Sequence, residues 1–219
     1  MLLKTEDVND AQFASTPPQA PAWQMAAKRG LDMVGSALAL VIFSPLFVLI
    51  AILVRLTSPG PVFFRWHVVG NAGKPFVGYK FRSMHEGADR AREQLRDQNE
   101  MSGVFFKMKN DPRVTSVGQV LRRFSLDELP QLWSVLVGHM SLVGPRPSQV
   151  FEHRQLTEWQ KQRVQMKPGL VSLWIVSGKT KDFDEMVRLD LYYTYNWSMW
   201  LDLEILLRAL PYVILGKNS

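Results

Sequence analysis

The feature that most constrains this chain is the segment 33–54, which carries no charge and has Pro45 near its centre. As one helix rising about 1.5 Å per residue, it is just long enough to cross a bilayer. A proline in mid-helix removes a backbone hydrogen bond and clashes with the preceding turn, at a cost of about 3 kcal/mol. The halves 33–44 and 45–54 are each too short to cross alone. We therefore predict an N-terminal membrane helix that is broken at Ser44–Pro45.

The basic residues around this segment leave two topologies open. Lys28 and Arg29 precede it, and Arg55 and Arg65 follow it. Because basic flanks stay on the cytoplasmic side, both ends fit that side if the segment turns back at its proline. A kinked helix that crosses once fits these residues about as well, and a buried helix of a soluble protein is the least favoured alternative. A signal peptide is excluded, since the apolar run is too long and no cleavage site follows it.

Composition limits the rest of the chain. Its 219 residues suffice for one domain with a hydrophobic core, and its net charge of +6 indicates an anionic partner such as phosphate, acidic lipid or nucleic acid. The absence of cysteine excludes thiol catalysis, disulfides and cysteine metal sites. We predict a flexible tail over 1–25, a membrane helix over 26–57 and a folded domain over 58–219.

The stretch 121–147 holds the strongest candidate for a catalytic site. An adjacent carboxylate pair, Asp127–Glu128, follows Arg122 and a second arginine. Ser125 is a favourable helix N-cap, and Glu128 stands three residues later, as in a capping box. We therefore predict that Asp127 lies in the first turn of a helix, where the helix dipole and the arginines favour its ionised form.

Two interpretations of this pair stay open from the residues alone. In phosphoryl chemistry one carboxylate attacks or takes a proton, the other holds Mg²⁺, and arginines bind phosphate oxygens. In the structural interpretation Glu128 only completes a capping box and Asp127 is only a favourable first-turn acid. Capped helices with acidic first turns are common, so these residues by themselves favour the structural interpretation.

Basic residues in two other places could reach a phosphate group. Lys80 and Arg82 end a predicted strand, either as charges that protect a sheet edge or as phosphate ligands. The Gly-Pro-Arg-Pro turn at 144–147 could hold Arg146 still for bidentate contact with phosphate, or it could be a plain connection.

The remaining patterns predict an α+β fold that is mostly helical with a small β-sheet. The aromatic residues near the C-terminus suit either a membrane interface or the core. Periodicity and turn residues predict strands over 62–66, 76–81 and 104–109, a turn at 71–74, an exposed helix over 85–100, and a helical region over 183–215 interrupted near Asn196.

From about residue 26 to the C-terminus, the chain resembles the bacterial sugar transferases, also called monotopic phosphoglycosyl transferases. Members of that family move a sugar-1-phosphate from a UDP-sugar onto a polyprenyl phosphate. Separate segments carry the resemblance in the family's order: KRGLDMVGSALALVIFSPLFVLIAILVRLTSPGPVFF (28–64), GKPFVGYKFRSM (73–84), KNDPRVTSVGQVLRRFSLDELPQLW (109–133), MSLVGPRP (140–147) and LDLYYTYNWSMWLDLEIL (189–206).

The resemblance implies a re-entrant helix carrying a catalytic domain over 58–219, on the cytoplasmic face of the bacterial inner membrane. It implies that Asp127 attacks the β-phosphate of the donor, so that UMP leaves and a sugar-phosphate stays on the enzyme until undecaprenyl phosphate takes it. Such a step opens the synthesis of a surface polysaccharide or glycoconjugate. Glu128 would hold Mg²⁺, and the expected ligands of the phosphate oxygens are Arg122, Lys80, Arg82 and Arg146.

The expected partners follow from this activity. They are a UDP-sugar, undecaprenyl phosphate and membrane phospholipids; no nucleic acid is expected, and a homodimer is left open. The sequence departs from many relatives at Val171, Ser172, Ile175 and Lys179, so the sugar cannot be assigned by analogy. A hexose is favoured over an N-acetylated sugar, because 176–197 looks like the galactose-transferring branch.

Two other classes of function remain as alternatives. One is a membrane-anchored scaffold or regulator without turnover, which the intact Asp–Glu pair disfavours. The other is a membrane-tethered nucleic-acid binder, which the dispersed basic residues disfavour.

Overall fold

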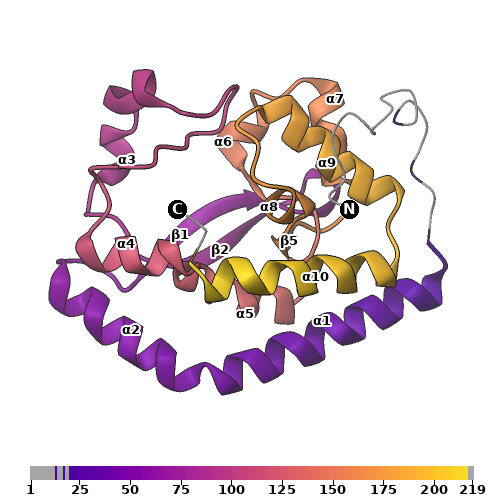
Figure 1. Cartoon of the computed structure of the whole chain (residues 1–219), viewed down its shortest axis with the longest axis horizontal. Helices are drawn as coiled ribbons and strands as arrows, with labels where there is room; N and C mark the ends of the chain where they lie inside the picture. The colour runs from indigo at the N-terminus through magenta and orange to yellow at the C-terminus, as the bar shows by residue number, and fades with distance from the viewer. Residues whose placement is uncertain (1–12, 14–16, 18–19, 217–219) are drawn as a thin grey trace.

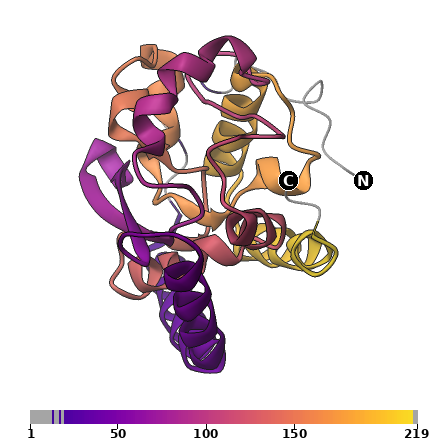
Figure 2. The same cartoon turned by 90° about the vertical axis from the view of Figure 1, so that its left-hand side faces the viewer.

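The N-terminal apolar segment forms two helices that meet at a bend. The computed structural model of the chain describes Phe13, Pro17 and residues 20–216. Helix α1 (Ala22–Ile42) and helix α2 (Ser44–Thr57) are bent by 61°. Within the described residues no single helix has the length and apolar composition to cross a membrane, whereas the bent pair taken together does. Figure 2 shows the pair extending from one side of the folded domain.

The break lies where the sequence predicts it. Ser44 is the first residue of α2, and Pro45 lies in its first turn, where a backbone N–H has no partner within the helix. The Ser44 hydroxyl group donates to the carbonyl of Val41 at 2.8 Å, which satisfies one of the last carbonyls of α1. Helix α1 begins at Ala22, so the end of the predicted tail 1–25 is helical. Most of that tail lies outside the described residues.

Helix α1 turns its polar side toward the protein and its apolar side outward. Its buried residues are Lys28, Asp32 and Ser36, which recur every fourth position on one face. A helix of a soluble protein has the opposite arrangement, so the buried soluble helix is disfavoured. An exposed apolar surface of this extent is typical of contact with a membrane or a partner. The large apolar side chains of α1 that are more than half exposed are Trp23, Leu31, Val34, Leu38, Val41 and Ile42.

Two small sheets form the centre of the folded domain. Strands β1 (Phe63–Val69) and β2 (Pro75–Phe81) make the predicted antiparallel hairpin, and β4 (Ser148–Gln149) extends it in the order β2-β1-β4. Strands β3 (Ser141–Val143) and β5 (Gly169–Val171) pair in parallel. The predicted strands over 62–66 and 76–81 are therefore confirmed.

Short helices surround these sheets (Figure 1). They are α3 (Ala88–Ala91), α4 (Ser116–Arg123), α5 (Gln131–Leu136), α6 (Val150–His153), α7 (Glu158–Lys161), α8 (Leu173–Val176), α9 (Phe183–Tyr195) and α10 (Met199–Ile214), with 3₁₀ turns at Asn71–Gly73, Glu93–Gln98, Leu126–Glu128 and Gln162–Gln165. The break predicted near Asn196 is found between α9 and α10. The helix predicted over 85–100 is instead divided into α3 and a 3₁₀ turn.

The strand predicted over 104–109 is wrong, because the segment is a loop. The Asn99 side chain bonds the main chain there in place of a neighbouring strand. Its amide nitrogen donates to the carbonyls of Met101 and Phe105 at 2.8 Å, and its oxygen accepts from the N–H of Lys107 at 2.8 Å. A single side chain thus satisfies backbone groups that would otherwise need a sheet.

Helix α1 is held on the domain through its polar face. Lys28 donates to Asp202 of α10 at 2.6 Å. Arg29 donates to two carbonyls of α5, both at 2.6 Å. The Asp32 carboxylate accepts from the N–H of Leu142 in β3 at 2.9 Å. These bonds join the apolar helix to the elements that carry the site.

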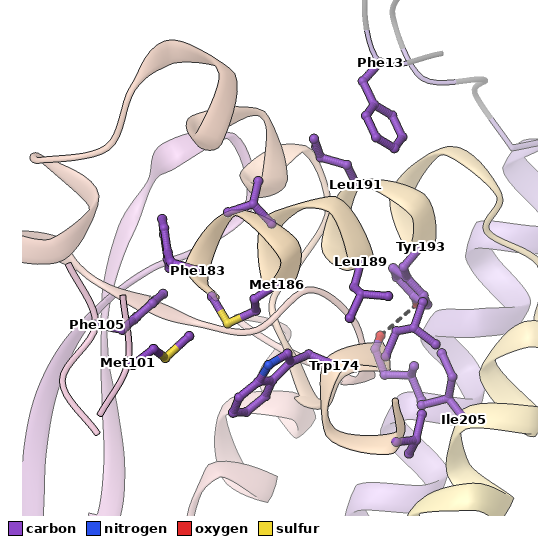
Figure 3. Packing of buried hydrophobic residues seen from close by; sticks show 14 of the residues in the cluster. Phe13, Met101, Phe105, Trp174, Phe183, Met186, Leu189, Leu191, Tyr193 and Ile205 are labelled. Carbon is purple, nitrogen blue, oxygen red and sulfur yellow. Dashed lines mark hydrogen bonds between the residues drawn. The ribbon is translucent and has the colours of Figure 1, made fainter. Parts of the chain in front are cut away.

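The main hydrophobic core lies around α8, α9 and α10, as Figure 3 shows. Met186 and Leu189 of α9 are fully buried there, together with Trp174 of α8. Among the C-terminal aromatic residues, Tyr193 is 1% exposed and lies in the core, whereas Trp200 of α10 is 73% exposed. Contact of Trp200 with a membrane interface stays a prediction.

Candidate active site

The Asp127–Glu128 pair lies in a 3₁₀ turn between α4 and α5. Ser125, which precedes the turn, has a left-handed backbone with φ 54°, and its side chain makes no capping bond. Helix α5 begins only at Gln131, after Pro130. The predicted capping box and helix start at Ser125 are therefore wrong, because the left-handed residue redirects the chain before the next helix can form.

Asp127 is a buried carboxylate, with 8% of the residue exposed. Burial and the adjacent Glu128 raise the pKa of its carboxyl group to about 6, while Lys80 and Arg122 act in the opposite direction. Arg122 favours the ionised form, as predicted, but burial and Glu128 outweigh the cations, so the net shift of the pKa is upward, opposite to the predicted direction. At pH 7 most of the group is still a carboxylate, and its basicity exceeds that of a solvated aspartate.

Glu128 is held as an anion by the cations around it. The Lys80 ammonium group donates to Glu128 Oε1 at 2.7 Å. Burial alone would raise the pKa of Glu128. The positive charges of Lys80, Arg146 and Lys179 lower it by more than burial raises it, so the pKa lies below its usual value. The two adjacent carboxyl groups are thereby separated in pKa by their environments, which is a common arrangement where two acids have different tasks.

Lys80 is placed by the hairpin of β1 and β2. Trp66 of β1 pairs with Gly78, two residues before Lys80, so the three residues share one face of the sheet. The Trp66 ring packs directly over Gly78, which has no side chain. A Cβ at this position would lie only 2.3 Å from the ring nitrogen. The Lys80 ammonium group lies 4.1 Å from the centroid of this ring, a cation–π contact that helps to fix its position.

Arg146 reaches the same place from the turn 144–147 between β3 and β4. At Gly144 the main chain of this turn lies directly against the main chain of β5 at Gly169. A Cβ on Gly169 would lie 2.1 Å from the nitrogen of Gly144, so no side chain fits between the two segments. The guanidinium carbon of Arg146 lies 4.6 Å from the ring of Trp174 in α8. The turn therefore packs closely against β5 and directs Arg146 toward α8, and its contact with phosphate stays a prediction.

These side chains surround a small cavity of about 30 Å³. Three of the predicted site residues line it, namely Lys80, Glu128 and Arg146, and the other lining residues come from β1, α5, the turn after Arg146, β5 and α8. The space admits about two water molecules, or one small ion and a ligand oxygen. A nucleotide sugar would therefore extend well beyond it.

Arg122 lies close to Asp127 but does not line this cavity. Its Nε donates to the hydroxyl group of Ser83 at 2.9 Å. Helix α4 approaches Ser83 closely because of Gly118, where a Cβ would lie 1.9 Å from the Ser83 carbonyl oxygen. The charge of Arg122 lowers the pKa of Asp127 and so counteracts part of the burial.

The structure does not bring Arg82 to this site. Its Nη2 donates to the carbonyl and hydroxyl oxygens of Ser58, at 2.8 and 2.9 Å. Gly60 has a φ of +107°, and a Cβ there would lie 2.2 Å from Arg82 Nη1, so the guanidinium group fills the loop between α2 and β1. The predicted phosphate contact of Arg82 is thus replaced by a structural one.

Two lysines that were not predicted as site residues lie near Arg146. Burial, Lys107 and Arg146 lower the pKa of Lys179 to about 8. Burial and Arg146 also lower the pKa of Lys107, whose ammonium group lies 5.6 Å from the Trp174 ring. Cations that repel one another in this way are suited to an anionic ligand. No sequence spacing connects the two lysines, and the departure from relatives at Lys179 was the one signal available.

Glu128 is the residue predicted to hold a divalent metal, and its Oε1 accepts a hydrogen bond from the Lys80 ammonium group. Among the residues that the structure describes, no group of three or more His, Cys, Asp or Glu side chains could hold a metal by itself. Magnesium in phosphoryl-transfer sites is commonly bound by one or two carboxylates together with substrate phosphates. The Asp127–Glu128 pair supplies carboxylate oxygens of this kind, and binding of Mg²⁺ at Glu128 stays a prediction.

Comparison with known proteins identifies the chain as a transferase. It belongs to the bacterial sugar transferase family, whose model matches residues 23–216. The family resemblance predicted from the sequence is thereby confirmed.

Three relatives illustrate the similarity. Galactosyl transferase CpsE of Streptococcus agalactiae serotype III (strain NEM316) is 42% identical over 197 residues, which are 89% of this chain and 44% of CpsE. Exopolysaccharide production protein ExoY of Rhizobium meliloti (strain 1021) is 40% identical over 198 residues, 88% of each chain. The UDP-glucose:undecaprenyl-phosphate glucose-1-phosphate transferase of Escherichia coli (strain K12) is 42% identical over 187 residues, 81% of this chain and 38% of that protein. The chain thus spans less than half the length of CpsE and of the E. coli transferase, and most of the length of ExoY.

Proposed function

We propose that this protein transfers a sugar-1-phosphate from a UDP-sugar to undecaprenyl phosphate, with release of UMP. The observation that carries the proposal is the buried Asp127 beside an anionic Glu128, with Lys80, Arg122 and Arg146 close to them. The name of the E. coli relative supports the donor and acceptor classes. The name of ExoY, an exopolysaccharide production protein, supports a role in exopolysaccharide synthesis, and we propose that the role is the first step of such a synthesis.

The proposed reaction has two displacements at one phosphorus atom. A carboxylate oxygen of Asp127 attacks the β-phosphorus of the donor, and the bond to the oxygen bridging the two phosphates breaks. UMP leaves with that electron pair, and an acyl phosphate bearing the sugar remains on Asp127. A phosphate oxygen of undecaprenyl phosphate then attacks the same phosphorus, which releases Asp127 as a carboxylate.

The remaining residues stabilise negative charge. Lys80 and Arg146 face the cavity and would bind oxygens of the diphosphate, and Arg122 would do so beside Asp127. Lys107 and Lys179 add positive charge near Arg146, where the leaving nucleotide phosphate needs it. Glu128 would hold Mg²⁺, which supplies further charge neutralisation on the diphosphate when bound.

A membrane location fits both the acceptor and the helix pair. We propose that α1 and α2 enter the inner membrane from the cytoplasmic face and return to it, contacting phospholipids through their exposed apolar side chains. The bend of 61° and the basic residues at both ends support this topology. The catalytic domain then lies on the cytoplasmic face, where UDP-sugars are present.

For the sugar we propose a hexose, because residues 176–197 resemble the galactose-transferring branch of the family. Relatives of this chain carry names for galactosyl, glucose and N-acetylgalactosamine transfer, so similarity alone does not decide it. The alternative function is an inactive membrane-anchored scaffold, which the grouped carboxylates and cations disfavour.

The test is release of UMP by the full-length protein in lipid nanodiscs with Mg²⁺, undecaprenyl phosphate and a panel of UDP-sugars. Release is expected with hexose donors and not with Asp127→Asn. No release from any donor would favour the scaffold. A preference of tenfold or more for an N-acetylhexosamine, about 1.4 kcal/mol in transition-state binding, would overturn the choice of a hexose.

A further inference from the structure

The most buried ion pair among the described residues joins two segments that the proposed mechanism does not use. Arg163, in the 3₁₀ turn Gln162–Gln165, pairs with Asp190 of α9, and each side chain is 1% exposed. Burial raises the pKa of Asp190 and lowers that of Arg163, and each charge opposes the shift of the other. A pair this deep contributes little net stability compared with apolar residues of similar volume, so its presence calls for another explanation.

Both charges of the pair bind the main chain of one residue, Arg146. The Asp190 carboxylate accepts from the N–H of Arg146 at 3.0 Å through Oδ1 and from Arg163 through Oδ2. The same Arg163 nitrogen donates to the carbonyl oxygen of Arg146 at 2.6 Å. The N–H on one side of the Arg146 Cα and the carbonyl on the other are thus held by one ion pair.

The neighbours of Arg146 restrict the turn further. Pro145 and Pro147 fix φ on both sides. The carbonyl oxygen of Pro145 accepts from the N–H of Gly169 at 2.9 Å, which ties the turn to β5. With φ restricted at its neighbours and both of its own polar groups bound, Arg146 has little freedom except in its side chain.

We infer that Arg163 and Asp190 are positioning residues that fix the backbone of Arg146 so that its guanidinium group is held in the cavity beside Lys80 and Glu128. The inference rests on the proposed function, because it assumes that Arg146 binds a phosphate oxygen. Placement matters at this scale, since a misplacement of about 1 Å can cost roughly a hundredfold in rate. The buried pair then serves the geometry of the site more than the stability of the fold.

The test compares single and double variants of the full-length protein in nanodiscs by their kcat/KM for UMP release. Asp190→Asn keeps an acceptor for the Arg146 N–H but removes the ion pair. Arg163→Lys keeps the positive charge but loses the planar guanidinium group that donates to both the Arg146 carbonyl and the Asp190 carboxylate. Each is expected to lower kcat/KM about tenfold or more. In the background of Arg146→Ala, the same substitutions are expected to cause less than about twofold further loss, because they act through Arg146.

Leu189→Ala is the matched control. Leu189 is the buried neighbour of Asp190 in α9, and its truncation destabilises the same core without removing a bond to Arg146. It is expected to lower the melting temperature while kcat/KM of the folded fraction stays near the wild-type value. Equal losses of kcat/KM in Leu189→Ala and Asp190→Asn would overturn the inference, as would additive losses with Arg146→Ala.

A second measurement separates the inference from the proposed function. Binding of inorganic pyrophosphate with Mg²⁺ is compared by calorimetry for the same set of variants. If wild type releases no UMP but binds pyrophosphate through Arg146, the proposed function fails. The positioning role is then decided by the pyrophosphate affinities of the single and double variants. If Arg146→Ala changes neither turnover nor pyrophosphate binding, Arg146 is no phosphate ligand and the inference fails with it.

Discussion

At the scale of single residues, two adjacent carboxyl groups are tuned in opposite directions. Asp127 is desolvated and has a raised pKa, whereas Glu128 is paired with Lys80 and has a lowered one. A carboxylate that must attack phosphorus benefits from higher basicity, whereas a metal ligand benefits from a permanent charge. The difference matches the roles proposed for the two residues.

Asp127→Asn is expected to abolish turnover and to stabilise the fold. Without a carboxylate no acyl phosphate forms, so UMP release should fall by at least about a thousandfold. Because the folded pKa of Asp127 is raised from 3.8 to about 6, the wild type loses stability as pH rises through this window. At pH 7 the free energy of unfolding of the variant should therefore be higher than that of the wild type by an amount on the order of 1–3 kcal/mol.

Chemical denaturation of both proteins at pH 4 and pH 7 checks this. The gap between variant and wild type should be larger at pH 7 than at pH 4. A variant that is less stable than wild type at pH 7 would contradict the raised pKa, and substantial UMP release by it would reject the covalent scheme.

Glu128→Gln should lose activity for a different reason. It removes the proposed metal ligand and leaves Lys80 without its ionic partner, so kcat/KM should fall by roughly a hundredfold, about 2.7 kcal/mol. The concentration of Mg²⁺ needed for half-maximal activity should rise. Glu204→Gln, which removes one partner of the half-buried pair with Arg208 on α10, is the control and should have no effect on either value. Near-normal activity of Glu128→Gln with only a lower melting temperature would leave Glu128 a structural residue.

The sequence predicted part of this site and missed the rest for physical reasons. Lys80, Glu128 and Arg146 could be predicted because each stands in a short motif, and they do line one cavity. The direction of the Asp127 pKa could not, because burial depends on packing between distant segments. The left-handed Ser125 was missed because serine followed three residues later by glutamate is also the pattern of a capping box.

At the scale of elements, the bend between α1 and α2 is set by a proline and a serine together. The Val41 carbonyl, which would accept from residue 45 in a continuous helix, accepts instead from the Ser44 hydroxyl group. The hairpin of β1 and β2 was also predictable, since turn residues separate two runs of strand-forming residues. The loop 104–109 was not, because its backbone partners come from the side chain of Asn99.

Pro45→Ala should straighten this bend. The alanine would supply the N–H that proline lacks to the Val41 carbonyl, which favours one continuous helix long enough to cross the bilayer. We expect the N-terminus to reach the periplasm in a fraction of molecules, and activity to fall in proportion. Ser44→Ala, which retains the proline, is the control and should keep both the topology and most of the activity. Full activity and an unchanged N-terminus in Pro45→Ala would mean that other contacts set the topology.

At the scale of the whole molecule, the topology can be tested with single cysteines. The chain has no cysteine of its own, so a cysteine introduced between residues 5 and 20 would be the sole site for a membrane-impermeant maleimide. In right-side-out spheroplasts no labelling is expected before lysis and full labelling after it. Labelling from outside would exclude the re-entrant pair and leave a helix that crosses once.

The polar face of α1 also determines the depth at which this enzyme would work. Lys28, Arg29 and Asp32 bind α10, α5 and β3, so the apolar helix is tied directly to the elements packed around the site. In the proposed topology, these contacts within the protein would set the height of the carboxylate pair above the hydrocarbon, whichever lipids surround it. An acceptor phosphate must come to that height, and the length of the lipid tail below it would matter little.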